Sequence, residues 1–154
     1  MSDYPYFPLF VDLSGKRIVV IGAGMVAARR IKALLTFTET VTVVAEAFDP
    51  SLMPLAEEKR IEIHKKPYEA SDIEGAFFVL AATDRKEVNL AVRQDCKRLG
   101  IPVNVSSDRE LCDFYFPGIA RKDDLVVGIT ASGRDHRGVK EAVKKLQEYL
   151  DSAT

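Results

Sequence analysis

The sequence has no tryptophan and only two histidines and two cysteines among its 154 residues, so it has few residues that could form disulfides or bind metal ions. Cys96 and Cys112 stand in no paired spacing, which is typical of free thiols in a reducing compartment and argues against a disulfide framework. No group of histidines and cysteines has the spacing of metal ligands. We therefore expect no resident metal.

Long apolar runs are also missing. No stretch approaches the ~20 apolar residues that a membrane helix requires. The segment from Met1 to Phe10 has no basic stretch followed by an apolar run, as a secretory signal would. These absences predict a cytoplasmic protein with no membrane partner.

An excess of charge of one sign is absent as well. Lysine plus arginine number 22 and aspartate plus glutamate 23, which gives a net charge of −1 and predicts no nucleic-acid partner. Apolar residues make up 47% and charged residues 29%, the composition of an ordinary soluble domain. No repeat or long linker divides the chain, so we expect a single domain over residues 1–154.

What is present is an alternation of apolar strands and amphipathic helices. Strands are predicted at 17–21, 41–45, 61–64, 77–81 and 102–105, with helices at 25–35, 50–59, 84–99 and 138–150. Pro54 predicts that the second helix is short or broken. Asp84 and Glu87 have the spacing of a capping box for the third helix, whose predicted buried stripe is Val88, Ala91, Val92 and Leu99. Apolar runs at 114–120 and 125–130, around four charged residues, predict an antiparallel hairpin.

A glycine motif lies between the first strand and the first helix. Gly22-Ala23-Gly24-Met25-Val26-Ala27 has the G-x-G-x-x-A pattern, in which the first glycine permits a sharp turn and the second lets backbone approach a pyrophosphate. The free N–H groups that open the helix favour an anion there. This motif, with its strand and helix, predicts an α/β fold: a Rossmann-type, doubly wound, mainly parallel sheet with a C-terminal antiparallel hairpin and a closing helix.

Glu46, followed by Ala47, comes just after the second strand and about 20 residues beyond Gly24, where an acidic side chain accepts hydrogen bonds from ribose hydroxyls. A carboxylate there repels a 2′-phosphate, so the pattern favours NAD over NADP. The alternative interpretation is an ordinary glycine turn with a solvated Glu46.

Two more polar positions follow predicted strands. Thr83 and Asn104 are expected at the carboxyl edge of the sheet, where ligands of open α/β sheets bind. We therefore add both to the candidate cofactor-binding residues. Capping of the following helix is an alternative and compatible role for Thr83.

Three segments together resemble one family. YPYFPLFVDLSGKRIVVIGAGMVAARR from Tyr4, AATDRKEVN from Ala81 and PVNVSSDRELCDFYFPGIARKDDLVVGITASG from Pro102 resemble the N-terminal domain of siroheme synthase, the NAD-dependent precorrin-2 dehydrogenase and sirohydrochlorin ferrochelatase family. The resemblance covers almost the whole chain. It implies a homodimeric NAD enzyme that oxidises precorrin-2 to sirohydrochlorin, and in many relatives inserts ferrous iron. Relatives commonly continue into a helical dimerisation region, which we expect this chain to lack.

The resemblance also suggests site residues. The substrate carries many carboxylates, and cations that follow the last parallel strand are candidates to hold them: Arg109, Arg121, Lys122, Arg134, His136 and Arg137. The family places an aspartate three residues after Asn104, where this chain has Ser107. We therefore expect Asp108, the next residue, to be the base that removes a proton, with Ser107 positioning a water. Asp113 is a further candidate, with capping or solvation as its alternative role.

Two other classes of protein fit the same motifs. One is a non-catalytic module that binds NAD or a tetrapyrrole, which Ser107 favours. The other is a regulatory Rossmann domain, which would bind a dinucleotide and no tetrapyrrole.

Overall fold

The computed structural model describes residues 4–153, which form two compact units. One consists of residues 11–114. The other joins residues 4–10 to residues 115–153. The expected single domain over residues 1–154 stays a prediction.

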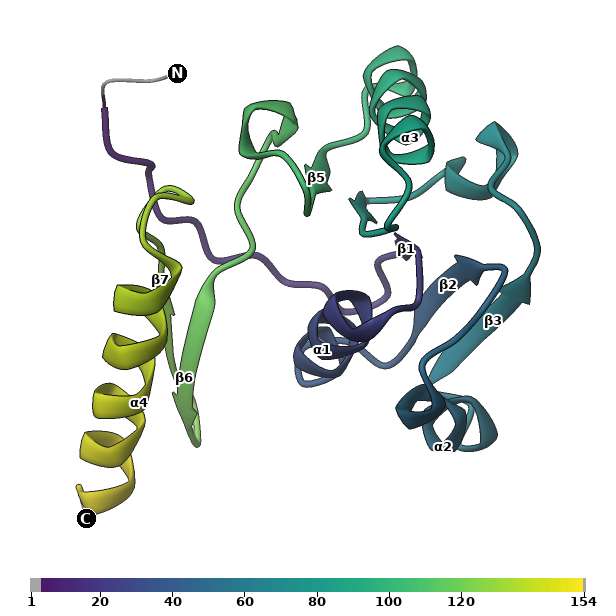
Figure 1. Ribbon diagram of the computed structural model, residues 1–154. Helices are drawn as coiled ribbons and strands as arrows, with labels where there is room; N and C mark the ends of the chain where they lie inside the picture. The colour runs from purple at the N-terminus through teal and green to yellow at the C-terminus, as the bar shows by residue number, and fades with distance from the viewer. Residues whose placement is uncertain (1–3, 154) are drawn as a thin grey trace. The chain divides into compact units, whose positions relative to one another are not determined.

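The 11–114 unit is built on a parallel sheet of five strands (Figure 1). Its strands are β1 (Ile18–Ile21), β2 (Val41–Ala45), β3 (Ile61–Lys65), β4 (Phe78–Ala81) and β5 (Val103–Val105). They lie in the order β3-β2-β1-β4-β5, with Val20 paired to Val43 on one side and to Leu80 on the other. Because the chain continues outward from β1 in one direction to β3 and in the other direction to β5, the strand order changes direction beside β1. Ligands of such sheets bind at this point.

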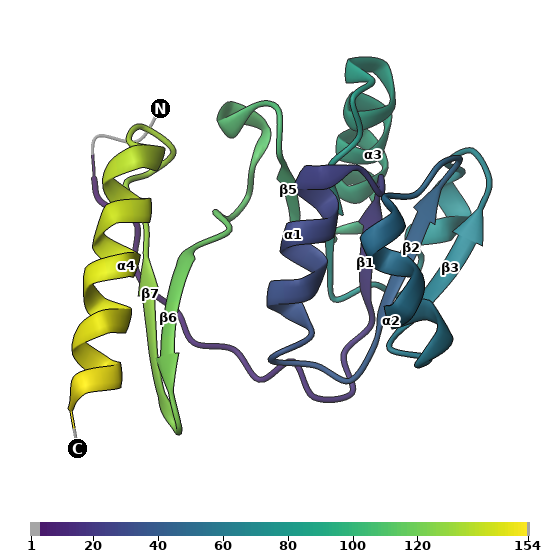
Figure 2. The same ribbon diagram turned by 60° about the horizontal axis from the view of Figure 1, so that its bottom comes forward.

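Helices cover both faces of this sheet (Figures 1 and 2). One face carries α1 (Met25–Leu34) and the short pair η1 (Pro50–Leu52) and α2 (Met53–Glu57); the other carries η2 (Ala70–Ile73) and α3 (Lys86–Leu99). A third 3-10 turn, η3 (Arg109–Leu111), follows β5. The predicted break near Pro54 is confirmed, since the turn and helix there have only three and five residues.

Burial on both sides explains the apolar strand sequences. All four residues of β1 are buried, as are the first four of β2. Each buried valine or isoleucine side chain contributes about 1.5–3 kcal/mol relative to an exposed one. The edge strand β3 has only one buried residue, as its alternating sequence predicts. The expected doubly wound parallel sheet is confirmed.

The start of α3 differs from the prediction. Arg85 and not Asp84 is the N-cap residue, and no side chain caps the helix. The Thr83 hydroxyl instead accepts a hydrogen bond from the Arg85 N–H at 3.2 Å, so a local turn sets the helix start one residue later. The predicted buried stripe was partly wrong, because Leu99 is 37% exposed and Asn89 is buried instead. Gly100 ends the helix in a left-handed conformation.

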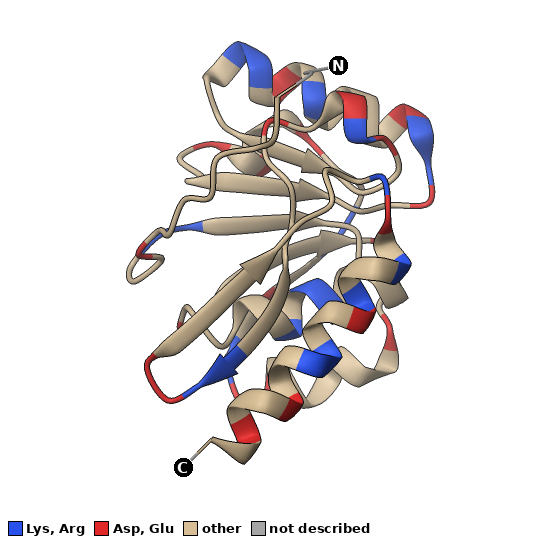
Figure 3. Ribbon diagram, turned by 90° about the vertical axis from the view of Figure 1, so that its left-hand side faces the viewer, with Lys and Arg blue, Asp and Glu red and all other residues tan. Residues whose placement is uncertain are grey.

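The second unit contains an antiparallel hairpin and a helix. β6 (Gly118–Lys122) pairs with β7 (Leu125–Ile129), and α4 (His136–Ser152) packs against β6. Lys/Arg and Asp/Glu positions are interspersed along α4 and at the hairpin turn (Figure 3). The hairpin and the closing helix are thus as predicted.

Candidate functional site

The turn after β1 has a shape that requires glycine. Gly22 has φ +106°, and a Cβ atom there would lie 2.4 Å from the carbonyl oxygen of Ala82. Its N–H donates to the carbonyl of Val44 at 2.9 Å, so this turn is held between the ends of β2 and β4. Gly22 therefore allows three strands to end close together.

Gly24 has a different role, because its surroundings are open. A Cβ atom at Gly24 would meet no heavy atom within 4 Å. It is the N-cap of α1, with no side-chain hydrogen bond and no acidic residue in the first turn. The first N–H groups of a helix have no partner within it and carry partial positive charge. The residues present therefore fit a dinucleotide pyrophosphate, with the backbone from Ala23 to Val26 as its cradle.

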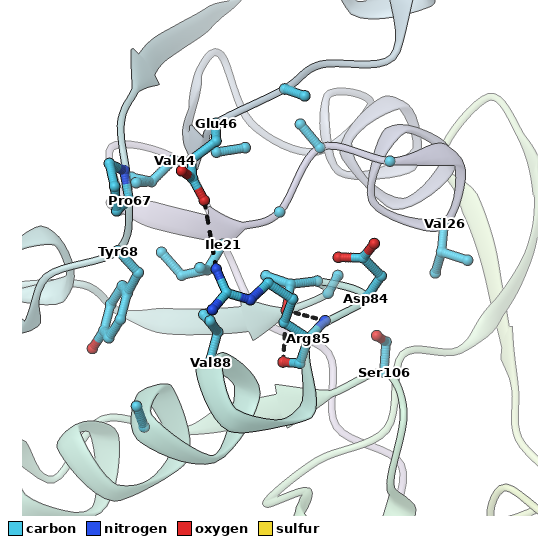
Figure 4. Close-up of a pocket in the computed structure, with 18 of the residues that line it drawn as sticks. Ile21, Val26, Val44, Glu46, Pro67, Tyr68, Asp84, Arg85, Val88 and Ser106 are labelled. Carbon is cyan, nitrogen blue, oxygen red and sulfur yellow. Dashed lines mark hydrogen bonds and ion pairs between the residues drawn. The ribbon is translucent and has the colours of Figure 1, made fainter.

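A cavity of about 730 Å³ opens from this turn along the carboxyl edge of the sheet (Figure 4). Its walls come from the glycine turn, the ends of β2 and β4, the loop after β3 and the first turns of α3. Seven predicted cofactor residues line it together with Thr83: Gly22, Ala23, Gly24, Met25, Val26, Glu46 and Ala47. Its size lies in the range of small-molecule sites.

Glu46 faces a cation across this cavity. Its Oε2 lies 3.7 Å from Nη1 of Arg85, which stands at the start of α3 (Figure 4). The Nε of Arg85 donates to Glu87 at 2.8 Å. This hydrogen bond, with the charges of Glu87 and Glu46, raises the pKa of the Arg85 guanidinium, so it stays charged. Composition and spacing gave no signal for Arg85.

Asn89 joins the loop after β4 to the loop after β5. This side chain is 2% exposed, and its oxygen accepts hydrogen bonds from the N–H and hydroxyl of Thr83 at 3.2 and 2.7 Å. Its amide nitrogen donates to the Thr83 carbonyl at 3.1 Å and to Ser107 Oγ at 3.2 Å. This role of Asn89 was not predicted from the sequence, although a polar residue between Val88 and Val92 on a packed helix was a usable signal.

Asn104, on β5, is held by two side-chain hydrogen bonds. It is buried, its oxygen accepts from Nη1 of Arg30 at 2.6 Å, and its nitrogen donates to the carbonyl of Phe114 at 2.9 Å. Burial lowers the pKa of the Arg30 guanidinium. The Asn104 amide therefore ties α1 and the segment after η3 to β5. It is not among the residues that line the cavity.

The candidate base lies in the loop after β5. Ser106 lines the cavity, and Ser107 and Asp108 follow it on the surface. The Asp108 carboxylate accepts from the Glu110 N–H at 3.0 Å and caps η3. The Asp113 carboxylate accepts a hydrogen bond from the Val103 N–H at 3.0 Å and forms an ion pair with Arg93. Of these two aspartates, Asp108 lies closer in the chain to the cavity wall.

The candidate substrate cations divide between the two units. Arg109 belongs to the 11–114 unit, where its Nε lies 3.4 Å from Glu110. Arg134, His136 and Arg137 belong to the other unit and are exposed, and Arg137 pairs with Glu141 at 3.3 Å. These last three residues lie within four positions of one another in the chain, just before and at the start of α4.

Within residues 4–153, no group of three or more His, Cys, Asp or Glu side chains is arranged to hold a metal ion. His64, on β3, lies 2.7 Å from Glu62. No helix in the same range is long and apolar enough to cross a membrane. The expected lack of a resident metal stays a prediction.

Comparison with known proteins decides the family. The chain matches the family described as "Putative NAD(P)-binding" over residues 9–118. It is 33% identical over 144 residues to the precorrin-2 dehydrogenase of Bacillus subtilis strain 168, and the match covers 94% of this chain and 88% of that protein. The chain belongs to the precorrin-2 dehydrogenase family. This confirms the resemblance seen in the sequence and the expected nicotinamide dinucleotide cofactor.

Other relatives of the family are longer. A multifunctional siroheme biosynthesis protein of Ruminiclostridium josui is 38% identical over 152 residues, and the siroheme synthase of Methylococcus capsulatus is 38% identical over 128. These matches cover 96% and 83% of this chain but only 30% and 27% of those proteins. The chain therefore spans less than a third of either relative.

A solved structure shares the fold. The precorrin-2 dehydrogenase SirC matches with a TM-score of 0.80 and 24% identity, covering 95% of this chain and 74% of SirC. The likeness confirms the expected fold class of this family member.

Proposed function

We propose that this chain is an NAD-dependent precorrin-2 dehydrogenase that forms sirohydrochlorin in sirohaem biosynthesis. The observation that carries this proposal is the match to the Bacillus subtilis enzyme along nearly the whole of both chains. The cavity supports the proposal, because both groups that a Rossmann-type NAD site needs line it. The glycine turn can hold the pyrophosphate, and Glu46 can accept hydrogen bonds from the adenosine ribose.

The residues of the cavity have distinct roles in this reaction. NAD, when bound, supplies the nicotinamide that accepts a hydride from the substrate. The backbone N–H groups from Ala23 to Val26 hold the pyrophosphate, and the Glu46 carboxylate accepts hydrogen bonds from the hydroxyls of the adenosine ribose. Thr83, fixed by Asn89, shapes the wall at the end of β4. Asn104 is held at β5 by its hydrogen bond to the Phe114 carbonyl, and its predicted contact with the cofactor stays a prediction.

Oxidation of the macrocycle also releases a proton, so a base is required. We assign this role to Asp108, whose loop is attached to the cavity wall through Ser106 and through the Asn89–Ser107 hydrogen bond. Ser107 orients a water beside it. Arg109, Arg134, His136 and Arg137 are proposed to bind the substrate's carboxylates, because arginine pairs with carboxylates in two parallel hydrogen bonds.

We further infer a cytoplasmic homodimer. Cys96 and Cys112 are free, and burial raises the pKa of the Cys96 thiol to about 12. Free thiols fit a reducing compartment. Tyr4, Phe7 and Leu9 are each at least 75% exposed, and apolar side chains gathered in one segment are typical of an interaction surface.

Turnover tests the proposal directly. Purified protein supplied with precorrin-2 and NAD should produce NADH and sirohydrochlorin in equal amounts, followed by their absorbance under anaerobic conditions. A protein that binds NAD tightly and produces no NADH at any precorrin-2 concentration contradicts the proposal.

That second result would favour a non-catalytic binding module. One observation points this way: Ser107, at the position of the family's aspartate, is engaged by Asn89 at 3.2 Å and has no carboxylate. Titration with sirohydrochlorin then separates a tetrapyrrole-binding module from a regulatory domain that binds only the dinucleotide.

A further inference from the structure

Two cations line the cavity in the part of the chain that the structure describes, and they are held differently. Lys66 is turned into its own loop, where Nζ contacts Glu69 at 2.6 Å and Asp72 at 2.8 Å. Arg85 instead faces Glu46 across the cavity (Figure 4). Arg85 is thus the cation that faces the carboxylate expected to accept the adenosine ribose.

The geometry of Arg85 leaves Glu46 able to bind a ribose. The strong contact of the guanidinium is with Glu87, at 2.8 Å and within the first turn of α3. The 3.7 Å separation from Glu46 is too long for a hydrogen bond, so this attraction is purely electrostatic. The Glu46 oxygens therefore stay available to accept hydrogen bonds from hydroxyl groups. Glu87 meanwhile holds the positively charged Arg85 guanidinium beside Glu46.

Glu46 and Arg85 have opposite effects on the choice between NAD and NADP. A lone carboxylate after β2 repels the 2′-phosphate of NADP, whereas an arginine nearby accommodates it. Here both are present within 4 Å. A 2′-phosphate carries more than one negative charge and would interact with both at once.

We propose that Arg85 is a specificity-determining residue that sets how strongly the site prefers NAD over NADP. Glu46 disfavours the 2′-phosphate, and Arg85 offsets part of that repulsion. Neutralising Glu46 leaves a guanidinium already in place for NADP. This inference rests on the proposed role of Glu46 in cofactor binding.

Binding of NAD and NADP to the full chain tests the idea without any turnover. Glu46→Gln should strengthen NADP binding by about tenfold, since two unit charges 4 Å apart interact by about 1 kcal/mol in water and by more near a protein surface. Arg85→Gln should raise the ratio of the NADP to the NAD dissociation constant by about three- to tenfold. In the double variant, the NADP gain of Glu46→Gln should largely disappear.

Lys86→Gln is the matched control. Lys86 is the next residue on α3, is exposed and does not line the cavity, so the substitution removes the same charge from the same helix turn. It should change the NADP to NAD ratio by less than about twofold, and salt should reduce the Arg85 effect. Calorimetry gives both dissociation constants, and circular dichroism checks that each variant is folded.

The possible results are distinct. If Arg85→Gln and Lys86→Gln change the ratio equally, or if the double variant keeps the full NADP gain, the assignment of Arg85 is overturned. If the unmodified protein binds neither dinucleotide, the proposed function fails with it. If NAD binds and is reduced, but Arg85→Gln leaves the ratio of the NADP to the NAD dissociation constant unchanged, only the inference about Arg85 fails.

Discussion

The substitution Gly24→Asp should abolish cofactor binding while leaving the fold intact. The backbone there has φ −76° and ψ −170°, which any residue adopts, and a Cβ atom would meet nothing within 4 Å. Aspartate is also a preferred N-cap residue, better than glycine by a few tenths of a kcal/mol. We therefore expect the free energy of unfolding to stay within about 0.5 kcal/mol of the original value.

The binding loss follows from the same position. A carboxylate at Gly24 would compete for the N–H groups of the first turn of α1 and face the doubly charged pyrophosphate. Repulsion between unit charges 4 Å apart is about 1 kcal/mol in water and about 4 kcal/mol near a protein surface, for each of the two charges. The NAD dissociation constant should rise at least ~100-fold. Gly24→Ala, which adds a methyl group without charge, should cause a smaller loss.

Gly22→Ala is the opposite case and provides the contrast. Its Cβ atom would lie 2.4 Å from the oxygen and 2.7 Å from the carbon of the Ala82 carbonyl, at φ +106°. Strain and overpacking together should cost on the order of 2–5 kcal/mol of stability. Urea unfolding and calorimetry with NAD measure both effects. NAD affinity of Gly24→Asp within about threefold of the original would refute the pyrophosphate assignment.

Other positions give further expectations. Asn89→Leu leaves buried polar groups of the β4–α3 turn without partners, so urea unfolding should show a loss of about 1–3 kcal/mol per group; unchanged stability contradicts this role. Asp108→Asn should slow NADH formation at least ~100-fold with NAD affinity retained, and full activity would exclude it as the base. Gly118→Ala puts a Cβ atom 2.7 Å from Val139 Cγ1 and should destabilise the second unit by about 1–3 kcal/mol, measured by hydrogen exchange in α4, where unaltered protection would count against the packing. Cys96, with a pKa of about 12, stays a protonated thiol at pH 8, so thiol reagents should modify it only after unfolding; rapid modification of the folded protein would disprove its burial.

Much of the fold was predictable because it depends on short-range patterns. Four-residue apolar strands, the glycine turn and the helical periods each follow from residues that are neighbours in the chain. Glu46 was predictable for the same reason, because the βαβ unit fixes how far the second strand lies from the glycines. The resemblance suggested the proposed activity, and the Bacillus subtilis relative is named for that activity.

The position of individual side chains was harder to predict. The sequence indicated Asp84 as the cap of α3, but the Thr83 hydroxyl supports a turn that begins the helix after Arg85. Asn104 was expected at the cofactor because it lies on a strand at the correct edge. In the structure its side chain bonds to Arg30 and Phe114, which lie 74 and 10 residues away in the chain, and these partners were not predicted.

The sequence by itself determined the parallel sheet, the glycine turn and the acidic residue that follows β2, because each depends on local periodicity or on a spacing along one continuous βαβ unit. Only the tertiary structure decided that Arg85 faces Glu46, that Asn89 joins two loops and that Asn104 bonds to Arg30 and Phe114. These contacts depend on which backbone groups and charges are brought within a few ångströms by the packing of segments that are distant in the chain.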